Sequence, residues 1–197
     1  MHFRVPLRTD WRHHHHRATL KNMSAIDDKY ASLGGPGGFL GRPFDAGAGS
    51  QEMETADSRG RFRDFDNGSI IWSPQTGAFE VHGDIRIKWA QLGGERGFLG
   101  FPLTDELGTP DGQGRFNHFQ GGSIYWTLKT KAHEVHGAIR EKWASMGFER
   151  SRLRYPISDE RPVSGGPGRF SQFQGGAIHW TPDGGAVVSF TVLFDDD

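Results

Sequence analysis

Two glutamate–histidine pairs are the side chains of this sequence best placed to do chemistry. The tripeptide Glu-Val-His occurs at 80–82 and again at 134–136. Residues two apart on a strand share one face, so each pair is able to exchange a proton or to hold a metal ion. A single active site would occur once, whereas this pair occurs twice and is replaced by Val188 and Phe190 at a third place. We therefore favour a structural hydrogen bond, with glycan contact and then catalysis or metal binding as alternatives. The four residues are Glu80, His82, Glu134 and His136.

Polar or aromatic side chains beside recurring aromatic residues are the candidate ligand contacts. Three lie one residue before a recurring Phe, and two lie one residue before a recurring Trp. They are Asp64, His118 and Gln172 in the first group, and Tyr125 and His179 in the second. Because side chains alternate along a strand, we expect all five to point away from the layer of Ile and Trp. A polar face with aromatic rings suits a glycan, which offers many hydroxyls and few charges; ordinary solvated surface is the alternative.

Three tryptophans recur at one place in the pattern, namely Trp72, Trp126 and Trp180. Core packing is the favoured interpretation, because large aromatic side chains are mostly buried. We expect the three to occupy equivalent, largely buried positions. The alternative is a sugar-stacking platform, with the ring face against the C–H face of a sugar and the ring edge free to hydrogen-bond.

Other kinds of site find no support in the sequence. The absence of Cys excludes disulfides, a Cys nucleophile and thiolate metal sites. Motifs for phosphate binding, for a nucleophilic serine and for zinc proteolysis are missing. Acidic pairs recur at 105–106 and 159–160, whereas a glycosidase uses one unique pair of carboxylates, so these pairs indicate turn or cap chemistry. We expect no catalytic residue, no metal and no cofactor.

Net charge argues against nucleic acid as a partner, and hydropathy argues against a membrane span. With 23 basic and 24 acidic residues the net charge is −1, which gives no global field for nucleic acid. No apolar run approaches the ~18 residues of a membrane span. Residues 1–23 form a basic segment with a run of four histidines, His13–His16. This segment has no apolar core of a secretory signal, and we expect it to be disordered or to derive from an expression tag.

The recurrence of these residues reflects an internal repeat. Residues 60–90, shifted by 54 positions onto 114–144, give 19 identical pairs out of 31, where chance gives about two. A second shift of 54 positions reaches residues 168–182. We divide the single domain 24–197 into three repeats. Their approximate bounds are 24–82, 83–136 and 137–191.

Each repeat is expected to fold as a short helix, a proline turn, a β-hairpin and a further strand. Ile85, Trp89 and Leu92 form an apolar helical stripe that ends at Gly93, and Asn67-Gly68 is a strong hairpin signal. No repeat is able to bury its own aromatic residues, so its neighbours must supply the rest of the core. We predict an α+β fold with three helices and about nine strands. The neighbouring repeats are either stacked or closed into a ring, and we favour a pseudo-symmetric ring or partial ring, closed by residues 186–194 packed near the first repeat.

The tetrapeptide at 99–102, Leu-Gly-Phe-Pro, and the G-R-F…F-x-x-G-x-I-x-W hairpin after it resemble the LGFP-repeat family. The resemblance covers about residues 24–188. It implies a non-catalytic module, often attached to cell-envelope enzymes of actinobacteria, that binds or anchors to cell-wall polysaccharide. It also implies a propeller-like ring of repeats. Arg42 replaces the aromatic residue of the tetrapeptide in the first repeat, and Arg154 replaces its Gly in the third, which puts ligand contacts at those turns in doubt.

We therefore expect a lectin-like carbohydrate-binding module in an extracellular or cell-envelope location. Its partner is a cell-wall or other polysaccharide, and homo-oligomers are possible. A structural or protein-interaction scaffold is the first alternative, and a hydrolase that uses the Glu–His pairs is the second.

Overall fold

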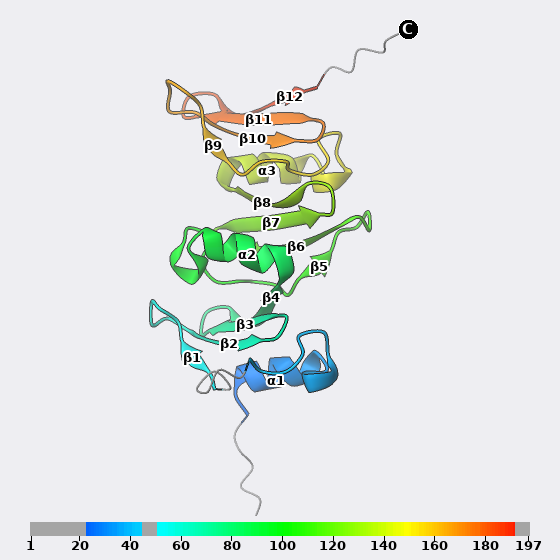
Figure 1. The fold of residues 1–197 in the computed structure, drawn as a ribbon. Helices are drawn as coiled ribbons and strands as arrows, with labels where there is room; N and C mark the ends of the chain where they lie inside the picture. The colour runs from blue at the N-terminus through cyan, green and yellow to red at the C-terminus, as the bar shows by residue number, and fades with distance from the viewer. Residues whose placement is uncertain (1–22, 45–50, 192–197) are drawn as a thin grey trace, which may run out of the picture.

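Three short helices and three four-stranded sheets alternate along a column in the computed structural model (Figure 1). The structure describes residues 23–44 and 51–191, so the N-terminal segment lies outside it. The first helix lies at one end of the column and the last strand at the other (Figure 1). Within the described residues the repeats therefore stack in a line, and the expected ring with its contact between the two ends is not formed. Stacking makes closure unnecessary, because α2 and α3 are each covered by the sheets before and after them.

All three units contain the same elements in the same order. The first unit has α1 Ala25–Ser32, β1 Met53–Glu54, β2 Arg61–Phe65, β3 Gly68–Ser73 and β4 Gly77–His82. The second has α2 Gly83–Gln91, β5 Leu107–Gly108, β6 Gly114–Phe119, β7 Gly122–Thr127 and β8 Lys131–His136. The third has α3 Gly137–Ser145, β9 Arg161–Pro162, β10 Arg169–Phe173, β11 Gly176–Thr181 and β12 Gly185–Phe190. Each sheet is antiparallel and follows the chain order. The two-residue strands β1, β5 and β9 were not predicted, since two residues carry no alternation.

The helices end at the glycines that the sequence predicts, and α1 begins at a serine cap. Ser24 caps α1, because its Oγ accepts a 3.1 Å hydrogen bond from the backbone N–H of Asp27, and the Asp27 carboxylate accepts one from Ser24 at 3.3 Å. Gly34, Gly93 and Gly147 follow the three helices with φ of 95°, 98° and 99°. This left-handed conformation favours glycine and ends each helix.

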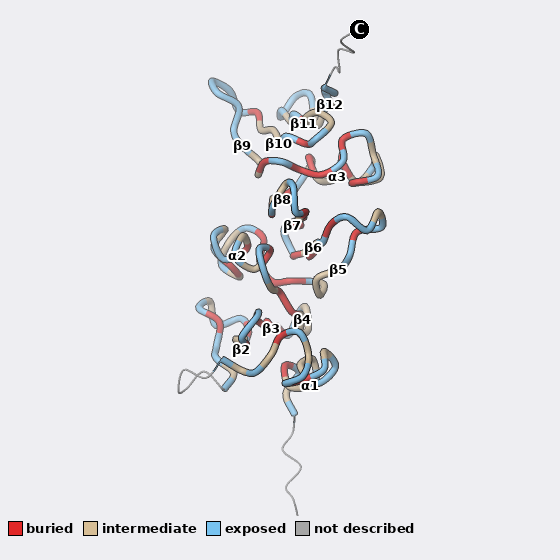
Figure 2. The backbone as a smooth tube through the Cα atoms, turned by 45° about the vertical axis from the view of Figure 1, so that its right-hand side comes forward, coloured by how far each residue is buried: buried red, intermediate tan, exposed pale blue. Residues whose placement is uncertain are grey.

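The first two sheets are buried on both faces. In β3, Ile70 packs with Ile26 of α1, whereas Ile71 packs in the core around α2. The second sheet repeats this arrangement, with Ile124 on the side of α2 and Tyr125 on the side of α3. Buried residues accordingly gather between the layers of the column (Figure 2). Successive residues of one strand thus serve two different cores.

The outer face of the third sheet is open, because no helix follows it in the described chain. Here His179 stands at the place of Ile71 and Tyr125, and Ser189 stands at the place of Val81. Both His179 and Ser189 are exposed. The replacement of apolar by polar side chains suits a face in contact with water.

The aromatic residue of the LGFP tetrapeptide joins one unit to the unit before it. Phe101 is 2% exposed, and a Cβ added to Gly60 of the preceding hairpin would lie 2.6 Å from its Cε1 atom. Tyr155 takes the same place against Gly114. Arg42, the equivalent residue of the first unit, is exposed. The tetrapeptide position is thus aromatic in the two units where its side chain packs against the hairpin of a preceding unit.

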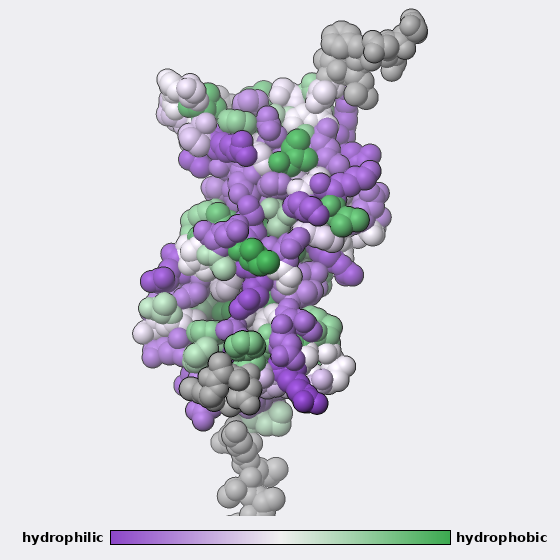
Figure 3. Space-filling view, in the orientation of Figure 1, coloured by the Kyte–Doolittle hydropathy of each residue, from purple (hydrophilic) through white to green (hydrophobic). Residues whose placement is uncertain are grey.

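The surface is mostly hydrophilic. In the view of Figure 3, hydrophobic residues are scattered between hydrophilic ones. Among the described residues no helix has the length and apolar character needed to cross a bilayer.

Candidate functional site

Tyr125 is a core residue, which corrects its predicted place on an outer face. Its side chain is 3% exposed. The ring lies 5.0 Å from that of Phe116 and 4.7 Å from that of Trp143 in α3. Burial raises the pKa of the Tyr125 hydroxyl well above its usual range. The prediction failed because it assumed that one face of each sheet meets water, whereas α3 covers this face.

Asp64 and His118 lie on the predicted face but are engaged by arginines of the next helix. Arg86 of α2 contacts the Asp64 carboxylate at 3.0 Å. Arg140 of α3 donates to Ser123 at 2.7 Å and lies 3.4 Å from Nδ1 of His118. Burial, and after it the Arg140 charge, lower the pKa of His118 to about 4. Both predicted residues therefore hold adjacent units together.

Gln172 and His179 are the two predicted residues that stay exposed. Both lie on the open face of the third sheet, where His179 stacks on Phe170 with 5.6 Å between ring centroids. The five predicted residues thus fall in three different units. They do not form one site.

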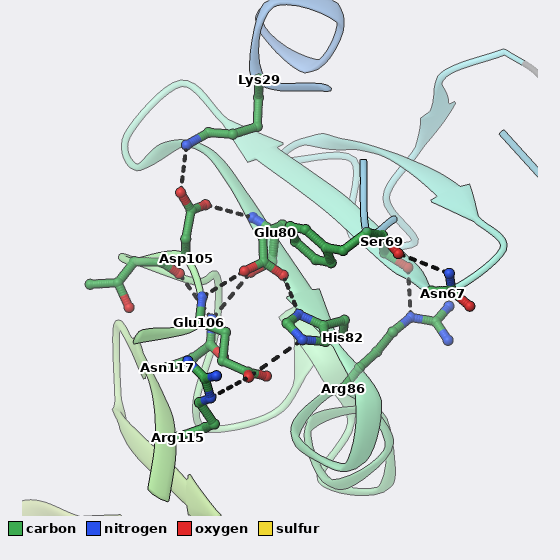
Figure 4. A network of polar contacts seen from close by, with 12 residues as sticks. Lys29, Asn67, Ser69, Glu80, His82, Arg86, Asp105, Glu106, Arg115 and Asn117 are labelled. Carbon is green, nitrogen blue, oxygen red and sulfur yellow. Dashed lines mark hydrogen bonds and ion pairs between the residues drawn. The ribbon is translucent and has the colours of Figure 1, made fainter. Parts of the chain in front are cut away.

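The Glu–His pairs form the hydrogen bond that we favoured. Nδ1 of His82 lies 2.7 Å from Oε2 of Glu80, which is 2% exposed. The other oxygen of Glu80 accepts the backbone N–H of Glu106 at 2.8 Å, and Asp105 accepts the N–H of Glu80 at 3.0 Å (Figure 4). Asp105 also binds Lys29 of α1 at 2.8 Å. The network therefore connects two units, because α1 and β4 belong to the first and the turn at 104–106 belongs to the second.

The same network recurs between the second and third units. Glu134 is 2% exposed and lies 2.7 Å from Nδ1 of His136. It accepts the backbone N–H of Glu160 at 2.8 Å, and Lys88 of α2 lies 2.8 Å from Asp159. In both networks the hydrogen bond to the buried glutamate raises the pKa of the histidine, against burial, which lowers it. Both oxygens of each buried carboxylate therefore have an internal hydrogen-bond partner.

Each imidazole of these networks is covered by an exposed phenylalanine. Phe39 lies 4.9 Å from His82, and Phe98 lies 4.6 Å from His136. About half of each phenylalanine is exposed, 47% and 50% respectively. We assigned the acidic pairs at 105–106 and 159–160 to turn chemistry. In the structure these pairs take part in the two Glu–His networks, and each network has a phenylalanine ring beside its histidine.

The hairpin tryptophans are equivalent, as predicted, and each is half-buried, with its side chain packed against a core cluster. Each pairs across the hairpin with the arginine of the Gly-Arg-Phe motif: Arg61 with Trp72, Arg115 with Trp126 and Arg169 with Trp180. The side chains of these arginines are 61%, 57% and 42% exposed. The tryptophans fall short of full burial because they lie near the open end of the hairpin, away from its turn.

A mostly buried glutamate stands behind each arginine. The three glutamates are Glu52, Glu106 and Glu160, with side chains 15%, 10% and 6% exposed. Arg61 lies 3.6 Å from Glu52 and Arg115 lies 3.9 Å from Glu106, while Arg169 bonds Glu160 directly. We call each group of Trp, Arg and Glu a Trp–Arg–Glu set. The sequence signal was present, because a Glu precedes the arginine by the same interval in all three repeats.

Two of the Trp–Arg–Glu sets line surface hollows. The hollow of the first unit has a volume of about 470 Å³ and includes Trp72, Arg61 and Glu52. The hollow of the third has a volume of about 230 Å³ and includes Trp180, Arg169, Glu160 and His136. Pockets for small molecules usually measure about 300–1,000 Å³, so the first hollow falls within this range and the third is smaller.

No metal site accompanies these groups in the part of the chain that the structure describes. There, no three His, Asp or Glu side chains are placed to hold an ion together. The Glu–His pairs are held by hydrogen bonds instead.

Comparison with known proteins identifies the repeat. The family model described as LGFP repeat matches three times, at residues 49–97, 99–151 and 153–193. The boundary between the first two matches falls beside the Leu-Gly-Phe-Pro tetrapeptide, and the boundary between the last two falls beside Leu153. No curated protein matches the chain. The three matches cover most of the sequence, and the chain therefore belongs to the LGFP-repeat family.

Proposed function

We propose that this protein is a non-catalytic module that binds polysaccharide through its Trp–Arg–Glu sets, in an extracellular or cell-envelope setting. The observation that carries the proposal is a half-buried tryptophan beside an exposed arginine, built at one register in every unit. The hollows at Trp72 and Trp180 give two of these sets room for a ligand. A polymer of similar sugars suits a surface of similar sites.

The chemistry of each set fits a sugar ring. A tryptophan offers an apolar face for the C–H groups of the ring and an indole N–H for one oxygen. The arginine donates several hydrogen bonds and the glutamate accepts them, so hydroxyl groups find partners of both kinds. Binding sites of this kind combine apolar walls with a few polar groups that fix orientation. Each shallow site alone is expected to bind weakly, at about millimolar Kd, and linked sites gain avidity.

Contacts outside the sets are also available to a polysaccharide. The predicted residues Gln172 and His179 remain exposed at the end of the column. Tyr125, by contrast, is withdrawn from the proposal, because its side chain is buried.

The decisive experiment compares retention on insoluble cell-wall polysaccharide for three variants. Trp180→Ala and Trp72→Ala each remove one half-buried ring, and we expect each to reduce the retained fraction while the melting curve stays cooperative. Phe44→Ala is the matched control, since this aromatic side chain is 55% exposed and lies outside the Trp–Arg–Glu sets and both hollows. Equal retention of both Trp variants and wild type would refute the proposed sites. Failure of the wild type to bind any wall polysaccharide or arrayed glycan would favour a protein-interaction scaffold.

A further inference from the structure

The three Trp–Arg–Glu sets differ in what the indole N–H of the tryptophan contacts. Nε1 of Trp126 donates to Oδ2 of Asp84 at 2.7 Å. Asp84 lies in the first turn of α2, and its equivalents in α1 and α3 are Ala25 and Ala138. Among the described residues, no acceptor is hydrogen-bonded to Nε1 of Trp72 or of Trp180. In the part of the chain that the structure describes, the middle unit alone thus supplies a partner for its indole.

The geometry of the third unit shows what the aspartate replaces. Ala138 lines the hollow of about 230 Å³ together with Trp180 and Arg169. A methyl group there leaves room beside the indole, whereas a carboxylate at the same place in the middle unit reaches the N–H. A hydrogen bond to a charged acceptor is about twice as strong as one between neutral groups. A neutral sugar hydroxyl would therefore compete poorly with Asp84 for the indole of Trp126.

We propose that Asp84 holds the middle site closed, so that the sites of Trp72 and Trp180 are the ones that bind sugar, each indole N–H donating to a hydroxyl oxygen. This inference rests on the proposed function. It deepens it by making Asp84 a residue that determines how many sites are open. The carboxylate of Asp84 acts as an internal substitute for the oxygen that the ligand supplies elsewhere.

The arrangement sets the length of ligand that binds best. The open sites belong to the first and third units, which lie at opposite ends of the column (Figure 1). Avidity arises only when one ligand reaches both sites. Long chains are therefore retained strongly, and short oligosaccharides that fill one site are retained weakly.

Two substitutions at equivalent helix positions test the role of the aspartate. Asp84→Ala gives the second unit the alanine found in the first and third units, and Ala138→Asp gives the third unit the aspartate of the second. Both positions lie in the first turn of a helix, where Asp is well tolerated, so we expect both variants to keep the wild-type far-UV circular dichroism. Asp84→Asn is a further variant that keeps a side-chain acceptor but removes the charge.

The first measurement needs no ligand. Exchange of the indole N–H protons with water, followed by NMR, is expected to be slow for Trp126 and fast for Trp72 and Trp180. Asp84→Ala makes the Trp126 proton exchange fast, Asp84→Asn gives an intermediate rate, and Ala138→Asp slows the Trp180 proton. Equal exchange rates for the three indoles of the wild type would overturn the inference.

The second measurement is calorimetric titration with size-fractionated oligosaccharides, obtained by partial acid hydrolysis of the wall polysaccharide that the wild type retains. We expect two binding sites for short fragments in the wild type, three in Asp84→Ala and one in Ala138→Asp. Binding with the same number of sites in all three proteins overturns this inference alone. Absence of binding to any wall polysaccharide overturns the proposed function, and with it the sugar-binding part of the inference, whatever the exchange rates.

Discussion

Truncation of the tetrapeptide aromatic should weaken the junction between two repeats. Phe101 is 2% exposed and belongs to the core around α2. Its ring fits against Gly60 of the preceding hairpin so closely that a single added carbon would contact it. Deleting a buried Phe side chain usually costs about 3–5 kcal/mol, as lost burial plus the cavity left behind. We expect Phe101→Ala to fall in this range, a large part of the ~5–15 kcal/mol that stabilises a typical domain.

The first repeat supplies the matched control for this substitution. Arg42 occupies the same place in its tetrapeptide but is exposed. Its backbone N–H, which any residue keeps, donates to Asp66 at 3.0 Å. Exposed substitutions away from special features usually change stability by less than about 0.5 kcal/mol. Arg42→Ala should therefore leave the free energy of unfolding nearly unchanged.

Urea unfolding followed by tryptophan fluorescence and circular dichroism measures both variants. In a stacked repeat protein a weakened junction also reduces cooperativity, so Phe101→Ala should lower the midpoint and broaden the transition or split it. A loss below about 1 kcal/mol, well short of a core truncation, would refute the anchoring role of Phe101. An equal loss in Arg42→Ala would show that the tetrapeptide position acts locally and does not join repeats.

Three further predictions concern the side chains between the layers. His118 has a folded pKa of about 4, below its unfolded value of about 6.5, so its neutral form favours the folded state and this stability is lost as pH falls from 6.5 towards 4. His118→Asp should remove that loss and pair with Arg140, which thermal melts at pH 5 and pH 7 would reveal as a smaller drop. His82 has a raised pKa, so its contribution is complete below about pH 6.5 and lost as pH rises through the folded pKa; His82→Gln should therefore flatten the stability profile on the alkaline side of 6.5. Tyr125→Ala should cost about 3–5 kcal/mol, whereas His179→Ala should change stability by less than about 0.5 kcal/mol, and a milder effect at Tyr125 than at His179 in urea unfolding would contradict their placement.

Local structure was predictable because each element carries its own signal. The helical stripe with its closing glycine predicted α2, which begins at Gly83 and is followed by Gly93 in the left-handed conformation. The Asn-Gly turn and the alternating strands predicted the hairpin between β2 and β3. These signals depend on neighbouring residues only. Because they recur along the chain, they also predicted that the three units are equivalent.

The arrangement of the units was not predictable from the same signals. A repeat that cannot bury its own apolar residues is able to bury them against its neighbours in a ring or in a linear stack. What decides here is that Ile70 and Ile71, adjacent in β3, pack against different helices. A hint was available, since Ile71 is apolar on the face that we expected to be polar. That face was assigned to solvent because Asp64 and His118 are polar, although both serve the arginines of the next helix.

Differences between the repeats have a structural cause at the ends of the described column. Arg42 differs from Phe101 where no described hairpin precedes it, and His179 differs from Tyr125 where no described helix follows. Variation at these positions therefore reflects what covers the residue, and it is weak evidence for a ligand. The features kept in every unit without being fully buried, the half-buried tryptophan and its exposed arginine, are the stronger evidence. Packing alone explains why a buried residue is the same in every unit. Packing does not explain why each unit has an arginine, about half exposed, opposite its tryptophan.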